Sequence, residues 1–170
     1  VSGGVTLGQV LAWVLLRANV THQKGVVDVL HPVKAQGSAE KPIIFTAVQD
    51  ASAGGSTNQG GVLSPGNGYS FLFTATSTDN VMDHVEVRYG GATGGGAIVD
   101  NGAPLILTNS IVRNTSSAGA GLRIISANPV VTGVTFRDNE SAAVSADLSA
   151  QPMIRNVTMS GNKYNGMLLD

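Results

Sequence analysis

One short stretch, "DNVMDHVEVRYGG" (residues 79–91), places an acid, a base and a cation at alternating positions. If its valines point into a core, the two-residue alternation of a strand puts His84, Glu86 and Arg88 together on the outer face, with Asp83 at the bend before them. A carboxylate, an imidazole and a guanidinium on one face are groups that bind an acidic polysaccharide or transfer protons to and from it. The same four residues also fit a solvated strand with a weak surface ion pair. We therefore take them as candidate binding residues and name no catalytic residue.

A catalytic face on repeated strands would need further acidic residues on the neighbouring strands. The chain contains a repeat of about 24 residues. One repeat later, the residues equivalent to Glu86 and Arg88 are expected near Ser110 and Val112, and two repeats later near Thr135 and Arg137. No ladder of aspartates forms at these positions. Three further aspartates, Asp100, Asp138 and Asp147, are expected singly in or near turns, where Asp is first a turn former.

Composition narrows the function classes further. The chain has 170 residues, a net charge of -1 and only 12% charged residues, and its Lys and Arg are scattered. A nucleic-acid partner is not expected, because phosphate binding needs a basic patch. The chain has no Cys, which excludes disulfides and thiolate metal sites. Its most apolar run, "VLAWVLL" (residues 10–16), is too short to span a bilayer, so no membrane insertion is expected.

The elements that must position the candidate residues repeat along the chain. Three similar lines begin at Pro104, Pro129 and Pro152, which are 25 and then 23 residues apart. Counted from each proline, three positions match, and a further column matches one turn away. These columns are Ile106, Val131 and Ile154; Ile111, Phe136 and Met159; Asn114, Asn139 and Asn162; and Ile98, Leu122, Val144 and Met167. A repeat of this length is typical of a solenoid.

Short β-branched alternation between Gly, Asn, Asp and Pro favours strands over helices. Strands of this kind with a fixed return wind as coils that pair with the next coil. The sequence therefore predicts an all-β fold: a single-stranded parallel β-helix of about six to seven coils, with ~22–25 residues per coil, whose right-handed sense is implied only by the family resemblance given below. The aliphatic columns are predicted to stack in the core, the Asn column to form a ladder at a turn, and each proline to start a strand.

We expect one domain over residues 1–170. A long Gly-rich loop, "VQDASAGGSTNQGGVLSPGNG" (residues 48–68), is expected to leave the coil as an insertion. Residues 1–24 fit either an N-terminal cap or a first coil. The strand-like last residues, "YNGMLLD", indicate a fragment of a longer chain.

The stretch "VKAQGSAEKPIIFTAVQDASAGGSTNQGG" (residues 33–61), together with the later "VRYGG" (residues 87–91), resembles a known family. It is similar to the right-handed parallel β-helix repeat domains, pectin-lyase-like in fold, of bacterial and archaeal surface and secreted proteins. The resemblance covers roughly residues 25–170 and implies the fold, its handedness and an extracellular or cell-surface location. Where the family pattern has an acid after Gly-Gly, this chain has Ser56. Asp50 alone leaves little to bind Ca²⁺, so no cofactor is expected and a calcium site stays an open alternative.

Two function classes remain. The leading expectation is a non-catalytic extracellular structural or adhesive module of a surface or filamentous assembly, which self-associates through its coil ends. The alternative is a carbohydrate-active protein, either a polysaccharide lyase or hydrolase or a glycan-binding module. It would use a groove between the 48–68 loop and the strand that carries His84, Glu86 and Arg88, with a polysaccharide as its partner.

Overall fold

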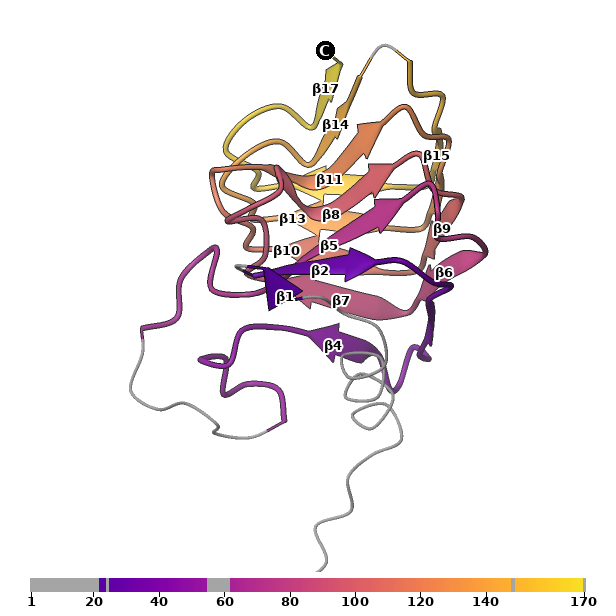
Figure 1. Cartoon of the computed structure of the whole chain (residues 1–170). Coiled ribbons are helices and arrows are strands. Elements are labelled where there is room, and N and C mark those ends of the chain that lie inside the picture. Colours follow the sequence, from indigo (N-terminus) through magenta and orange to yellow (C-terminus); the bar gives the residue numbers. More distant parts are fainter. Residues whose placement is uncertain (1–21, 24, 55–61, 148, 170) are drawn as a thin grey trace, which may run out of the picture.

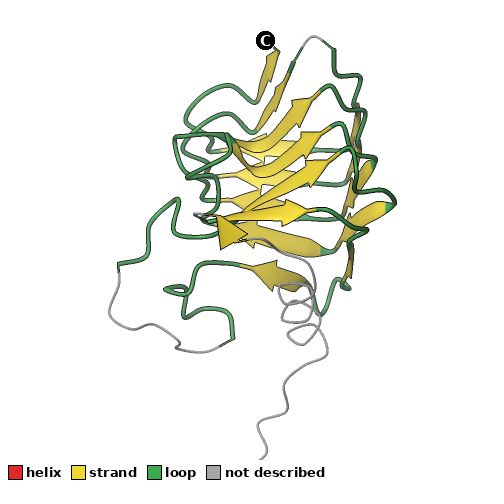
Figure 2. Ribbon diagram, in the orientation of Figure 1, coloured by secondary structure: helices red, strands yellow, loops and turns green. Residues whose placement is uncertain are grey.

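The computed structural model describes residues 22–23, 25–54, 62–147 and 149–169, and every regular element within them is a β-strand (Figures 1 and 2). No helix in this part of the chain is long and apolar enough to cross a membrane. The short strand β1 (His22–Gln23) pairs antiparallel with β2 (Val26–Val29). The choice between a cap and a first coil for residues 1–24 falls almost entirely outside the described residues.

The strands form three sheets. The first sheet has the order β1-β2-β5-β8-β11-β14-β17, with β5 (Ser70–Thr74), β8 (Gly96–Asn101), β11 (Ala120–Ile125), β14 (Val144–Ala146) and β17 (Met167–Leu169). The second contains β3 (Lys34–Gln36), β6 (Asn80–Asp83), β9 (Leu105–Thr108), β12 (Val130–Thr132) and β15 (Met153–Arg155). The third contains β4 (Ile43–Phe45), β7 (Val85–Arg88), β10 (Ile111–Arg113), β13 (Thr135–Arg137) and β16 (Thr158–Ser160).

The chain visits the three sheets in turn, and each strand from β2 to β14 pairs parallel with its equivalent one turn later. The result is an all-β parallel solenoid of about four turns, with roughly 24 residues per turn (Figure 1). The predicted column in the first sheet is confirmed, because the register pairs Ile98 with Leu122, Leu122 with Val144 and Val144 with Met167. The described residues show about four turns and do not show the six to seven coils that we expected.

The prolines stand where the sequence predicted them. Pro104, Pro129 and Pro152 immediately precede β9, β12 and β15. A strand start tolerates a residue without an N–H, because no ladder hydrogen bond is lost there.

The alignment of the three repeats on their prolines is nevertheless wrong by one residue for the first repeat, which begins at Pro104. Val131 pairs with Leu107 and not with Ile106, and Phe136 pairs with Val112 and not with Ile111. Leu107 and Val112 are fully buried, whereas Ile106 is 43% exposed. A shift of one residue moves a strand's side chains to the opposite face. The buried core residues therefore set the register. In this register Pro104 lies one residue upstream of the position that is equivalent to Pro129.

The predicted Asn ladder exists in shortened form. The Asn139 side-chain amide donates to Oδ1 of Asn162 (2.8 Å), and Oδ1 of Asn139 accepts the backbone N–H of Thr115 (3.1 Å). Thr115 therefore stands where we expected Asn114. Asn114 itself lies one residue earlier, at a turn with a φ of 55°, a left-handed conformation that Asn tolerates.

The inside of the solenoid is one apolar core to which all three sheets contribute. Its largest fully buried side chains include Phe73, Met82, Leu105, Leu122 and Phe136. Between β4 and β5 the described residues, 46–54 and 62–69, contain no strand and leave the stack of coils (Figure 1). We call this connection the β4–β5 segment. Residues 55–61 lie outside the described residues, and the predicted 48–68 insertion is not shown.

Candidate functional site

The strand β7 shows the alternation that the sequence predicted. Val85 and Val87 point into the core and are 1% exposed, which leaves Glu86 and Arg88 on the outer face of the third sheet. Both are nevertheless buried, at 8% exposed each. The expectation of a solvated surface pair is therefore wrong, because other side chains of the protein surround these two.

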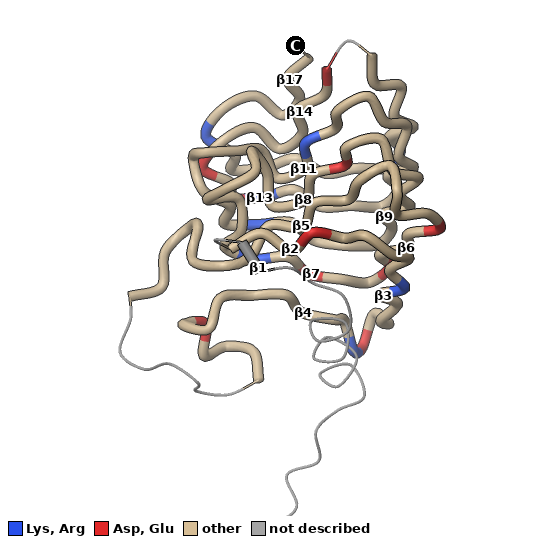
Figure 3. The backbone as a smooth tube through the Cα atoms, in the orientation of Figure 1, with Lys and Arg blue, Asp and Glu red and all other residues tan. Residues whose placement is uncertain are grey.

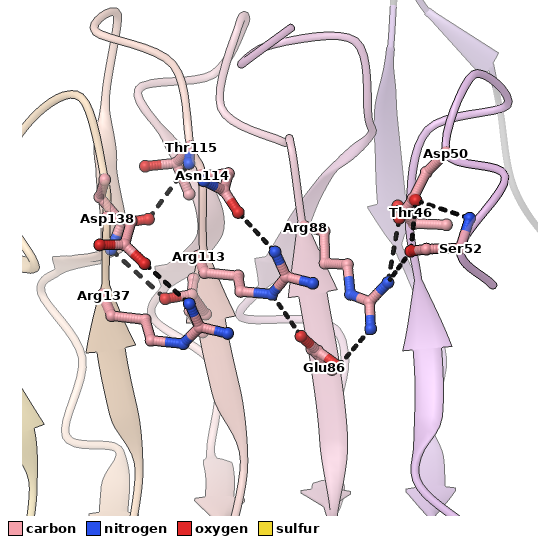
Figure 4. Close-up of polar contacts among 12 residues, drawn as sticks. Thr46, Asp50, Ser52, Glu86, Arg88, Arg113, Asn114, Thr115, Arg137 and Asp138 are labelled. Carbon is pink, nitrogen blue, oxygen red and sulfur yellow. Dashed lines mark hydrogen bonds and ion pairs between the residues drawn. The ribbon is translucent and has the colours of Figure 1, made fainter. Parts of the chain in front are cut away.

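Arg88 is held by the β4–β5 segment. Its Nη1 donates to Oδ2 of Asp50 and to Oγ of Ser52, both at 3.0 Å, and its Nη2 donates to Oε2 of Glu86 at 2.6 Å (Figure 4). Asp50 also accepts a hydrogen bond from Thr46 Oγ1 at 2.7 Å. The guanidinium thus joins two carboxylates, one on β7 and one beyond the end of β4.

Glu86 continues the network into the next turn. Its second oxygen, Oε1, accepts a hydrogen bond from Nε of Arg113 at 2.5 Å, and Arg113 Nη1 donates to Oδ1 of Asn114 at 2.6 Å (Figure 4). The register pairs Arg88 with Arg113, and Arg113 with Arg137. We expected Val112 as the equivalent of Arg88, so that prediction is wrong by one residue, while Arg137 is confirmed. Glu86 therefore binds guanidinium groups from two adjacent turns.

The network keeps its members charged. Burial alone would raise the pKa of Asp50, but hydrogen bonds from Ser52, Thr46 and Arg88 outweigh it and hold that pKa well below its ordinary value. Burial likewise acts to raise the pKa of Glu86, and the bonds from Arg88 and Arg113 lower it overall. Asp50 and Glu86 are therefore carboxylates at neutral pH.

Asp83 and His84 form a separate pair at the corner between β6 and β7. His84 has a φ of 49°, so it lies at the bend before the strand. Its Nδ1 is 3.0 Å from Oδ2 of Asp83, whose Oδ1 accepts hydrogen bonds from Thr108 Oγ1 (2.6 Å) and Asn109 Nδ2 (2.9 Å). Burial acts to raise the pKa of Asp83, and these bonds lower it overall.

The structure thus divides the four candidate residues into two pairs, one on the strand and one at its corner. Among the described residues, no hydrogen bond joins Glu86 or Arg88 to Asp83 or His84. The corner pair is the more accessible of the two, since the side chains of His84 and Asp83 are 28% and 26% exposed.

Sequence reasoning missed Asp50, Ser52 and Arg113 as partners in this site. A local clue exists for the first two, because Oδ1 of Asp50 accepts the backbone N–H and the hydroxyl of Ser52, as in an Asx turn. Nothing local indicates that this turn faces Arg88. Arg113 would have followed from the correct register of β10 against β7.

Metal binding gains no support from the described residues. They contain no group of three His, Asp or Glu side chains arranged to hold a metal ion. Asp50, the carboxylate that we considered too isolated to bind Ca²⁺, binds Arg88, Thr46 and Ser52. In the view of Figure 3, Lys and Arg are interspersed with Asp and Glu.

Fold and site together define the class: a parallel β-solenoid whose outward polar side chains pair with one another across turns. Residues 59–170, more than half of the chain, match the family model described as a right handed beta helix region. The chain belongs to this right-handed β-helix family, which confirms the resemblance and the handedness. Searches of the curated proteins and of the solved structures found no match.

Proposed function

We propose that this chain is a non-catalytic structural or adhesive module of an extracellular surface or filamentous assembly, in which the solenoid acts as a rigid spacer. One observation carries the proposal: Glu86 uses both carboxylate oxygens to bind Arg88 and Arg113. A general acid or base needs a pKa near the working pH and access to the substrate. Glu86 is buried and its pKa is lowered, which suits a cross-link between turns.

The β-ladders support a rigid spacer. Each turn pairs with its neighbours in all three sheets, so the stability of such an array is the sum of its repeats and their interfaces. We propose further that this chain forms six to seven coils, with residues 48–68 as an insertion. The Asp50–Arg88 ion pair fastens this insertion to the third sheet.

Self-association through the coil ends belongs to the same proposal. Strand β17 pairs with β14 on one side, and its residues Met167, Leu168 and Leu169 are all exposed. An exposed edge strand accepts a parallel or antiparallel strand from another chain. Sedimentation velocity at increasing concentration tests this part of the proposal: oligomers are expected, and a monomer at all concentrations would contradict it.

The alternative carbohydrate-active function is tested on the same protein. The purified chain is incubated with a panel of acidic and neutral polysaccharides, with and without Ca²⁺, while binding and the release of reducing or unsaturated ends are recorded. We expect no turnover. Binding without turnover would keep the non-catalytic proposal and identify a polysaccharide as the adhesive partner.

Turnover would overturn the proposal. The catalytic site would then be located with His84→Ala and Asp83→Asn, which change the partly exposed corner pair. The control is Lys34→Met, which removes the exposed ion pair between Lys34 on β3 and Asp79. Turnover that is lost only in the corner variants, at an unchanged thermal midpoint, would assign the chemistry to His84.

A further inference from the structure

Asp100 lies inside the solenoid. It is the fifth residue of β8, two positions after Ile98, and the strand alternation points both side chains into the core. The register pairs Asp100 with Phe73 on β5 and with Ile124 on β11, and all three residues are 0% exposed. We expected Asp100 singly in or near a turn; it lies beside the β8–β9 corner, and the structure also puts its carboxyl group into an apolar column.

The two oxygens of Asp100 differ in their partners. Oδ1 accepts the backbone N–H of Ala103 at 3.0 Å, across the corner that leads from β8 to β9. Oδ2 is buried and has no hydrogen-bond partner. A neutral carboxyl needs fewer partners than a carboxylate, whose charge is costly to bury without compensation.

Within the described part of the chain, no opposite charge compensates Asp100. Strands β5 and β9 and the corner residues 101–104 contain no ionisable side chain. Strand β11 contains Arg123, but the register pairs Arg123 with Val99, which lies on the outer face between the inward Ile98 and Asp100. Accordingly, burial raises the pKa of Asp100 to about 6, against a smaller lowering by the Ala103 N–H.

We propose that Asp100 makes the fold sensitive to mild changes of pH: the neutral carboxyl keeps the β8–β9 corner closed in the core, and its ionisation loosens that corner. The pKa in the folded protein lies above the ordinary value of 3.8. The stabilising contribution of Asp100 is therefore complete below pH 3.8 and is lost as the pH rises through about 6. A module of this kind is more stable in mildly acidic surroundings than at neutral pH. This inference is independent of the proposed function.

The test is urea unfolding of the intact chain between pH 4.5 and 7.5. For the wild type, Asp100 should raise the unfolding equilibrium constant by roughly 30-fold over this range. Asp100→Asn keeps the acceptor for Ala103 but cannot ionise, so this rise should disappear. The matched control is Asp147→Asn, because Asp147 is a corner carboxylate whose pKa is lowered, chiefly by a hydrogen bond from Ser149. In Asp147→Asn the unfolding equilibrium constant should still rise with pH, as in the wild type.

Equal pH dependence in the wild type and Asp100→Asn would overturn the proposal. If the variant does not fold, the ¹³C carboxyl shift of Asp100 in the wild type decides instead. A titration midpoint near 6 supports the proposal, and a midpoint at or below 3.8 contradicts it. Amide exchange at Ala103, corrected for the intrinsic rate, should lose protection above pH 6 before the amides of β9 do. Simultaneous loss would contradict the local opening of the corner.

Discussion

Arg88 and Asp50 are 38 positions apart in the sequence, and Nη1 of one lies 3.0 Å from Oδ2 of the other (Figure 4). This ion pair attaches the β4–β5 segment to the third sheet. It also explains why Glu86 is buried, since Arg88 lies between the two carboxylates and binds both. Asp50, Arg88, Glu86 and Arg113 thereby connect the β4–β5 segment with the outer faces of β7 and β10.

Replacing Arg88 with Met should destabilise the protein strongly. The change leaves the Asp50 carboxylate and one oxygen of Glu86 without their cation, and removing one partner of a buried ion pair costs about 3–5 kcal/mol. Lys34→Met is the control: the ion pair of Lys34 with Asp79 is exposed, so its loss should cost about 1 kcal/mol or less. Urea unfolding measures both free energies. Equal losses would show that the Arg88 network contributes no more than a surface pair.

The corrected register predicts different costs for two neighbouring residues. Leu107→Ala should cost about 2–5 kcal/mol, because Leu107 is fully buried and its loss leaves a cavity. Ile106→Ala should cost about 0.5 kcal/mol, as for an exposed position. Thermal and urea unfolding of both variants check the order. The reverse order would restore the register obtained by aligning the prolines.

Truncating the buried ladder residue Asn139 should also be costly. Asn139→Ala removes the acceptor of the Thr115 N–H and the donor to Asn162, at about 1–3 kcal/mol for each buried group left unpaired. Asn114→Gly, at the adjacent left-handed turn, should cost less than Asn139→Ala, because Gly adopts a positive φ without strain and only the acceptor of Arg113 Nη1 is lost. A large effect of Asn114→Gly would place Asn114 in the ladder after all.

Acid should weaken the Arg88 network. The pKa values of Asp50 and Glu86 are lowered from the ordinary 3.8 and 4.5. Their contribution to stability is therefore present above those values and is lost as the pH falls further towards the folded-state pKa values. The thermal midpoint, recorded at constant ionic strength from pH 3.8, below which the contribution of Asp100 is complete, down to pH 2, should fall. The fall should be smaller in Asp50→Asn, and an identical profile would contradict the role of Asp50.

Much of the architecture was predictable because its determinants are local and repeated. Alternation in "VEVR" (residues 85–88) put Val85 and Val87 inside without knowledge of any partner strand. The repeat length predicted the solenoid, and the column Ile98, Leu122, Val144 and Met167 is aligned as expected. Such patterns need only the chain's own periodicity.

The sequence by itself therefore determined the class of fold, the parallel pairing and most inward positions, since these follow from which side chains avoid water at each repeat. The tertiary structure alone decided the register of Leu107 and the partner of Arg88. The reason is physical: register depends on packing within the whole core, and the Asp50–Arg88 contact depends on where a long connection returns to the sheet. The same packing decides that Asp100 is a buried acid between Phe73 and Ile124, although Asp as a residue type favours turns.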